Sequence, residues 1–211
     1  MYQVQSVLNT DRKMQENSQM SPSIQEEVTR AVTALRKGRV LLYPTDTIWG
    51  LGCDIFNESA VKRIYEIKQR PENKPFVLLV DSIEMLKKYI KDIHPRVETL
   101  LTHHIQPLTI IYQSNGTLPD YLVSEEGTLA IRVTQDEFCK QIIGALGQPI
   151  ISTSANRAEQ PYPKNFQEID EVILKMADDI VDFRIKGEEG DQIPSVIATF
   201  NHKGDLSFIR N

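Results

Sequence analysis

The sequence predicts a single α/β domain in which helices flank one sheet of mixed parallel and antiparallel strands. A chain of 211 residues, 40% of them hydrophobic and 25% charged, is long enough to bury one full core. Stretches with helical periodicity alternate with short apolar stretches that are typical of buried strands. Two strand patterns close the chain with only a turn between them, and this order predicts an antiparallel pair within the sheet.

In the first part of the chain, each element follows from its periodicity and from the residues at its ends. Ser21-Pro22, with acidic residues in the next turn, is typical of a helix start. Pro71 requires a later helix to end by Arg70, because a residue before proline is pushed out of the α region. The run Phe76–Val80 is apolar throughout, which suits a strand covered on both faces. The expected elements here are a helix from Ser21 to Gly38, a strand at 40–43, a helix around Val61–Arg70 and a strand at 76–80.

The second part contains two helix starts with polar caps. Thr134 followed by Glu137 has the spacing of a capping box, and Gly147 ends that helix. Asn165 followed by Glu168 predicts another start, with an apolar face formed by Ile169, Val172, Ile173 and Met176. The remaining expected elements are a helix at 95–103, strands at 107–112, 128–133 and 149–152, and strands at 195–200 and 206–209 joined by the turn Asn201–Gly204.

Composition limits the possible functions. The net charge of −5 and the pI near 5.5 argue against a general nucleic-acid coat, although a local basic cleft is compatible with them. Residues 1–20 are polar, without sustained periodicity, and are expected to form a mobile tail before a domain at 21–211. No segment has the pattern of a signal peptide or a membrane span, so a cytoplasmic protein without membrane contact is expected.

A metal site or redox pair is not expected. Cys53 and Cys139 are far apart in the sequence and fit small buried residues better than a zinc site or a redox pair. Adjacent histidines cannot share one helix face, which argues against a ligand set built from His94, His103, His104 and His202.

Polar and cationic residues cluster near predicted strand and helix ends. Ligands of open α/β sheets bind beyond strand ends, where Thr45, Arg132 and Ser152 are expected. Lys68 and Arg70 are expected at a solvent-facing helix end, where two cations suit a polyphosphate. The competing interpretations are ordinary turn chemistry for the hydroxyls and a solvated helix end for the cations.

The sequence contains neither a Walker A motif nor a GxGxxG motif, so a bound nucleotide has to be held by side chains and turn amides. Ser154 and Asn156 can supply such contacts to a phosphate or a ribose. Asp46 can bind Mg²⁺ or cap its own turn, and the cap is the preferred interpretation.

Four motifs together resemble the YrdC/TsaC family, the threonylcarbamoyl-AMP synthases of tRNA modification, from about Ser23 to Arg210. They are YPTDT-x-x-GLGCD from Tyr43, the Lys68-x-Arg70 pair with Lys74-Pro75, T-x-A-x-R from Thr128, and STSAN from Ser152. The resemblance implies a twisted mixed α/β sheet with a basic concave cleft. It also implies an enzyme that joins L-threonine, bicarbonate and ATP, releases pyrophosphate and supplies a downstream transferase acting on tRNA.

The resemblance further assigns the site residues. ATP with Mg²⁺ enters as a substrate, no tightly bound cofactor is implied, and direct tRNA binding is not expected. Lys68 and Arg70 are the expected catalytic cations. The expected threonine contacts are Thr45, Arg132, Ser152 and Ser195, and the expected ATP contacts are Lys68, Arg70, Lys74, Thr128, Ser154, Asn156 and Arg210.

Some positions depart from the family pattern. Leu79 stands where longer relatives have a threonine-contacting histidine, and segments 104–106 and 157–160 differ from the usual sequences. The alternative function is a non-catalytic nucleotide- or RNA-binding protein of the YciO type. A third possibility is a carbamoyl-transferring or hydrolytic enzyme with the same pocket, as in hydrogenase-maturation proteins, which carry further domains.

Overall fold

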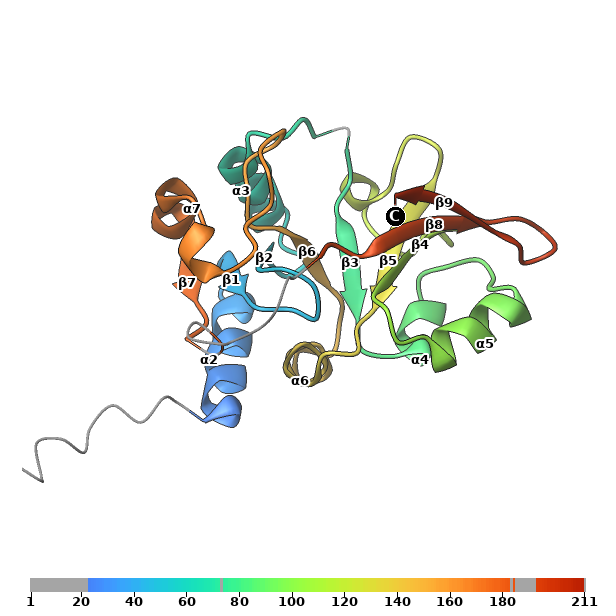
Figure 1. Cartoon of the computed structure of the whole chain (residues 1–211), viewed down its shortest axis with the longest axis horizontal. Helices are drawn as coiled ribbons and strands as arrows, with labels where there is room; N and C mark the ends of the chain where they lie inside the picture. Colours follow the sequence, from blue (N-terminus) through green and yellow to red (C-terminus); the bar gives the residue numbers. More distant parts are fainter. Residues whose placement is uncertain (1–22, 73, 183, 185–192, 211) are drawn as a thin grey trace, which may run out of the picture.

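The computed structural model describes residues 23–72, 74–182, 184 and 193–210. Its strands form one mixed sheet in the order β7-β1-β2-β6-β3-β5-β4-β8-β9, with helices packed around it (Figure 1). The strands are β1 Leu41–Tyr43, β2 Gly50–Gly52, β3 Val77–Val80, β4 Leu108–Gln113, β5 Thr128–Val133, β6 Ile150–Ser154, β7 Asp179–Ile180, β8 Val196–Phe200 and β9 Leu206–Arg210. The helices are α2 Ile24–Arg36, α3 Glu58–Lys68, α4 Ile83–Lys87, α5 Pro95–His103, α6 Glu137–Leu146 and α7 Glu171–Met176, with 3₁₀ turns η1 Asp120–Leu122 and η2 Phe166–Glu168.

The strand pairing confirms the mixed sheet. Three pairs are parallel, namely β1 with β7, β3 with β5 and β4 with β8, and the other neighbours run antiparallel. The C-terminal hairpin forms as predicted, with Phe200 opposite Leu206 across the turn. Pairing of β6 with both β2 and β3 joins the two halves of the sheet.

The core lies on both faces of the central strands. Leu78, Leu79 and Val80 of β3 are fully buried in succession, which confirms a strand covered on both sides. Ile150 and Ile151 of β6 are buried in the same way. A strand that is packed on both faces is held rigidly. Polar side chains at the end of such a strand therefore have well-defined positions.

Two helix starts differ from the prediction. The first helix is capped by Ser23, whose hydroxyl and Glu26 form a reciprocal capping box, and Ser21 lies outside the described residues. The cap of α6 is Asp136, whose carboxylate accepts the backbone N–H of Cys139. The hydroxyl of Thr134 instead accepts the N–H of Asp136 and so orders the cap itself. Both helix starts lie two residues beyond the predicted caps. The side-chain oxygens of Ser23 and Asp136 accept free N–H groups of the first turn.

Two further elements were drawn incorrectly from the sequence. The strand predicted at 149–152 continues through Ser154, because β2 pairs with its end and places Gly50 opposite Ser154. The helix predicted from Asn165 is interrupted. Asn165 caps only the 3₁₀ turn η2, and Asp170 caps a separate α7, on which Val172 is 41% exposed.

Strand β2 was missed by the sequence interpretation because it is short and rich in glycine. A Cβ atom on Gly52 would lie 2.5 Å from the carbonyl oxygen of Ile151 and 2.7 Å from the ring of Tyr43. The glycine therefore permits β1, β2 and β6 to approach closely at the point where the turn 44–49 leaves the sheet. The predicted tail at 1–20 lies outside the described residues.

Candidate active site

A cavity of about 450 Å³ opens on one face of the sheet and is lined by residues of β2 through β6, β8 and β9. Its described lining contains six of the predicted site residues: Arg70, Arg132, Ser152, Ser154, Asn156 and Ser195. The only charged side chains among these described lining residues are the two arginines. A chain with a net charge of −5 thus has a cationic cavity, as the resemblance implied.

Strand alternation brings the polar residues into one row. Arg132 of β5 lies opposite Thr109 of β4, and the hydroxyl oxygens of Thr109 and Ser195 are 2.8 Å apart. Ala130 and Ile111 form the next cross-strand pair on this face and also line the cavity. One section of the cavity is therefore polar and cationic, and the adjoining section is apolar.

Arg132 is held in place by the turn after β1. Its Nη1 donates to the hydroxyl of Thr47 at 2.9 Å, and its Nη2 lies 3.2 Å from a carboxylate oxygen of Asp46. The side chain is largely buried, and its Nε has no hydrogen-bond partner among the described residues. The residue also lines the cavity, and its planar guanidinium suits a carboxylate ligand.

Thr45 occupies a supporting position. Its hydroxyl donates to the carbonyl of Ile48 at 2.8 Å and accepts the N–H of Thr47 at 3.0 Å. Thr47, rather than Thr45, is among the described residues that line the cavity. Thr47 was missed as a site residue, although its position after Asp46 in the YPTDT motif could have indicated it.

Asp46 does not cap its own turn through any described contact. Its carboxylate instead accepts the N–H of Gln135 at 3.2 Å and the hydroxyl of Thr134 at 3.4 Å. Together with the ion pair to Arg132, these contacts tie the turn after β1 to the segment that precedes α6. The preferred interpretation of Asp46 as an Asx cap was therefore wrong.

Arg70 lies at the edge of the cavity on the segment between α3 and β3. Its Nε donates to the carbonyl of Lys74 at 3.0 Å and its Nη2 to the carbonyl of Pro75 at 3.2 Å. The guanidinium carbon is 5.2 Å from the centre of the Phe76 ring. These contacts fix the guanidinium while leaving it on the cavity wall, where it can meet an anion.

Lys68 is not at a solvent-facing helix end, and this part of the prediction was wrong. The side chain is buried, and its Nζ donates to the carbonyls of Ser154 at 2.5 Å and Asn156 at 2.6 Å. Burial, with a smaller contribution from Arg70, lowers the pKa of Lys68 to about 7. Lys68 is not among the described residues that line the cavity.

Two other predicted ATP contacts are absent from the described lining of this cavity, and a third has no described side chain. Lys74 has an exposed side chain outside the described lining, and Thr128 borders a neighbouring hollow of about 610 Å³. The Thr128 hydroxyl lies 2.7 Å from the hydroxyl of Ser124. The backbone of Arg210 pairs with Ile197, and its side chain lies outside the described part of the structure.

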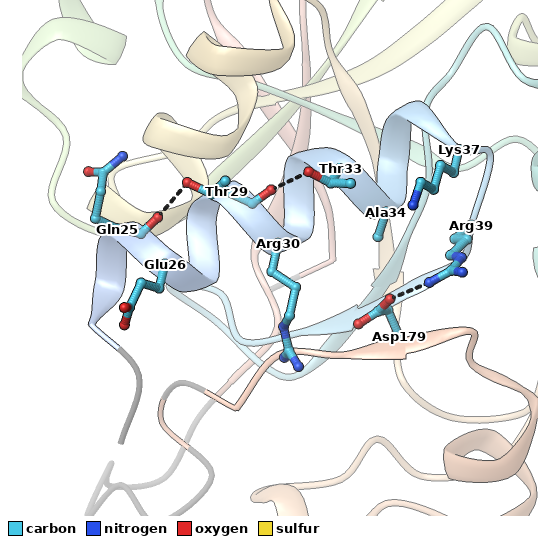
Figure 2. A pocket seen from close by; sticks show the side chains of 9 residues that line it. All are labelled: Gln25, Glu26, Thr29, Arg30, Thr33, Ala34, Lys37, Arg39 and Asp179. Carbon is cyan, nitrogen blue, oxygen red and sulfur yellow. Dashed lines mark hydrogen bonds and ion pairs between the residues drawn. The ribbon is translucent and has the colours of Figure 1, made fainter. Parts of the chain in front are cut away.

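Another hollow, on the outer side of α2, has none of the predicted site residues (Figure 2). The hydroxyls of Thr29 and Thr33 bond to carbonyls of their own helix, and Arg39 pairs with Asp179. No group of three or more potential metal-binding side chains occurs in the described chain. None of the described helices is both long enough and apolar enough to span a bilayer.

Comparison with known proteins identifies the family. Residues 33–211 match the Sua5/YciO/YrdC family model, whose description reads "Telomere recombination". The chain belongs to this family. It is 35% identical over 167 residues to the threonylcarbamoyl-AMP synthase of Xanthomonas axonopodis pv. citri, covering 78% of this chain and 87% of that protein. It is 34% identical over 147 residues to the enzyme of the same name from Escherichia coli O1:K1, covering 68% and 77% of the two chains.

Solved structures show the same fold. E. coli YciO aligns with a TM-score of 0.76 and 26% identity, covering 90% of this chain and 91% of that one. P. abyssi Sua5 complexed with L-threonine aligns with a TM-score of 0.76 and 24% identity, covering 90% of this chain. The chain spans 55% of the length of that Sua5 chain, so this likeness concerns the fold of the shared part.

Proposed function

We propose that the chain is a threonylcarbamoyl-AMP synthase, which joins L-threonine, bicarbonate and ATP and releases pyrophosphate. Relatives at 34–35% identity carry this name. The observation that carries the proposal is the pair of arginines that line the cavity, with no other charged side chain among the described lining residues. Two substrates with anionic groups, an amino acid and a nucleotide, match two cations that are already fixed by the protein.

Arg132 is the proposed partner of the threonine carboxylate. Its buried Nε has no described protein partner, while Thr47 and Asp46 hold its other nitrogens. Ser152 and Ser195 line the same cavity and supply hydroxyls for the amino acid, and the buried Thr109 contacts the Ser195 hydroxyl at 2.8 Å from outside the described lining. Thr45 has a supporting role, because its hydroxyl accepts the backbone N–H of Thr47.

The triphosphate is proposed to bind toward Arg70, Ser154 and Asn156. Arg70 supplies positive charge and Ser154 a small hydroxyl, while the Nδ2 of Asn156 donates to the carbonyls of Arg157 and Gln160 and its Oδ1 has no described partner. Mg²⁺ enters with ATP as part of the substrate, and its protein ligands are not assigned. Lys74, Thr128 and Arg210 remain proposed ATP contacts by resemblance alone.

The reaction needs no protein nucleophile. The threonine amine attacks the carbon of bicarbonate, and loss of water leaves an N-carboxylate on the amino acid. One oxygen of this carboxylate then attacks the α-phosphorus of ATP, the bond to the bridging oxygen breaks, and pyrophosphate leaves with the electron pair. The protein contributes by aligning carboxylate and phosphorus and by placing fixed cations near the developing charge.

The test is an assay for pyrophosphate and for threonylcarbamoyl-adenylate with purified protein. We expect pyrophosphate release only when threonine, bicarbonate and ATP are all present. Equal release from ATP alone would point to a pyrophosphohydrolase. Binding of ATP without any release would favour a non-catalytic protein of the YciO type. Transfer of the threonylcarbamoyl group from the adenylate to tRNA is assigned to a separate downstream enzyme, and omission of that enzyme from the assay should not change pyrophosphate release.

A further inference from the structure

The ammonium group of Lys68 lies among backbone carbonyls behind the cavity wall. Its two described bonds, to the carbonyl oxygens of Ser154 and Asn156, are 2.5 and 2.6 Å long. The side chain is 2% exposed, although Lys68 is the last residue of α3. A lysine in this position is seldom buried without an acidic partner, and here the carbonyl oxygens take the place of one.

We propose that Lys68 is a positioning residue, which ties the end of β6 to the end of α3 and thereby fixes Ser154 and Asn156 in the cavity wall. The proposal deepens the proposed function, because the identity of the ligand in the cavity rests on it. In this proposal Lys68 bonds to backbone carbonyls of the protein and does not contact the triphosphate. Its importance lies in where it places two other side chains.

A second bond runs in the opposite direction between the same segments. The backbone carbonyl of Lys68 accepts the N–H of Ala158 at 2.7 Å. The N–H of Asn156 also reaches the carbonyl of Ser154, at 2.9 Å, so this oxygen accepts from both the backbone and Lys68. Segment 154–158 is therefore wrapped around the end of α3 and held by the side chain and the backbone of one residue.

The same residue sets the position of Arg70. Gln69, which caps α3, has a left-handed backbone with φ of 49°, and this turn directs the chain from the buried Lys68 to Arg70 on the cavity wall. Lys68 thus connects the two sides of the proposed triphosphate site. A displacement of about 1 Å between such groups can reduce a rate by roughly a hundredfold.

Two observations argue against direct contact between Lys68 and the ligand. Its Nζ is surrounded by the carbonyls of the wall, and Lys68 is absent from the described lining of the cavity. Ser154 and Asn156, by contrast, are among the described lining residues. Displacing Lys68 toward a phosphate would break both carbonyl bonds and release the segment that carries these side chains.

A mutant cycle separates positioning from contact. Lys68→Met removes the ammonium group and keeps an unbranched apolar stem, and its effect on ATP binding is measured by calorimetry in the wild-type background and in Ser154→Ala/Asn156→Ala. Positioning predicts at least a tenfold rise in Kd for ATP in the wild-type background and less than a threefold rise in the double variant. Direct contact predicts the same factor in both backgrounds, and this result would overturn the proposal.

The free protein offers a second readout. Without Lys68, the amides of Asn156 and Ala158 should exchange with solvent at least ten times faster, while amides of β3 keep their protection. Lys62→Met is the matched control, because Lys62 lies on the exposed side of the same helix and pairs with Glu58. Unchanged exchange at Asn156 and Ala158 in Lys68→Met would contradict the proposed tie.

The outcome can be separated from that of the proposed function. If the wild type binds ATP but forms no adenylate, the synthase proposal fails, while the cycle is still read from ATP binding. If Lys68→Met does not fold, Lys68→Gln, which keeps one donor on a shorter stem, replaces it in the same cycle. The Kd for threonine should change by less than twofold in either variant, because Arg132 and Ser195 lie outside β6 and Ser152 is held by its pairing with Val77 of β3. An equal loss for threonine and ATP would show a general structural defect instead.

Discussion

At the residue scale, the neighbours of Arg132 orient its guanidinium for the proposed binding of the threonine carboxylate. We expect Arg132→Lys to raise the KM for threonine at least tenfold and to change the KM for ATP by less than twofold. A lysine keeps the positive charge near Asp46 but has no planar fork, so it cannot hold Thr47, Asp46 and a carboxylate at once. This variant is preferable to Arg132→Ala, which would remove the ion-pair partner of the partly buried Asp46. Steady-state kinetics with each substrate varied in turn measures the difference, and a parallel rise for ATP would contradict the division of the cavity.

Arg70 provides a second test at this scale. Arg70→Ala should lower turnover by roughly a hundredfold, in line with the loss of one preorganised charge-stabilising group. A stability loss of about 1–2 kcal/mol is also expected, since two carbonyls lose a donor and Phe76 loses its covering guanidinium. Arg63→Ala is the matched control on α3, where the arginine pairs with the half-exposed Asp178. Normal turnover in Arg70→Ala would remove Arg70 from the catalytic assignment.

Lys68 also has a consequence for pH dependence. Its pKa falls from 10.5 to about 7 in the folded protein, chiefly through burial. Above pH 7 the folded chain releases this proton while the unfolded chain retains it up to about pH 10, so the unfolded state binds more protons and the contribution of Lys68 to stability rises with pH.

The wild type should therefore gain about 2–3 kcal/mol of unfolding free energy relative to Lys68→Met between pH 6 and pH 9. Urea unfolding of both proteins across this range measures the difference directly. A constant difference would show that the burial of Lys68 carries no such pKa shift. The comparison with Lys68→Met is needed because other groups of the chain also titrate in this range.

At the element scale, the close approach of β1, β2 and β6 depends on Gly52. Gly52→Ala should destabilise the protein by about 2–4 kcal/mol, because the added Cβ would lie 2.5 Å from a backbone oxygen of β6. Gly144→Ala in α6 is the control. Its Cβ would meet the carboxylate of Asp81 at an ordinary 3.5 Å, so the change should be neutral or stabilising by up to about 1 kcal/mol. Thermal unfolding of the two variants decides between a steric requirement at Gly52 and a general intolerance of substitution.

The elements also show what could be predicted from the sequence. Strands 76–80 and 128–133 and the helix at 95–103 were predicted almost to the residue, because each has a clear pattern bounded by prolines, glycine or polar residues. The three-residue β2 was missed, since Gly50 and Gly52 carry no side-chain pattern. Its partner β6 was consequently ended too early at Ser152.

The site was predictable in composition more than in geometry. The motif residues Arg70, Arg132, Ser152, Ser154, Asn156 and Ser195 do meet at one cavity. The sequence could not show that Lys68 faces carbonyls, because the C-terminal position on α3 predicts exposure and only the wrapped segment 154–158 buries it. In the same way, Thr47 lines the cavity in place of the predicted Thr45 because of bonds within a short turn.

At the scale of the whole molecule, the described core comes from Val28 through Ala198 and is continuous across the sheet. The first described helix has its own cap in Ser23 and Glu26, so it needs no earlier residue to satisfy its first turn. Deletion of residues 1–20 should therefore leave the melting temperature within about 2 °C of the full chain and both KM values within twofold.

A deletion that also removes Ser23 is the informative comparison for that truncation. Loss of the cap should cost about 1 kcal/mol, because the N–H of Glu26 loses its hydroxyl acceptor and the side chain of Glu26 loses the N–H of Ser23. For a domain of this size the cost corresponds to a fall of about 2–4 °C in melting temperature. Differential scanning calorimetry of the full chain and both truncations measures the two steps. A fall larger than this on removal of residues 1–20 alone would mean that the N-terminal segment contributes to the stability of the domain. The cap at Ser23 would then not be sufficient to stabilise the first turn of α2.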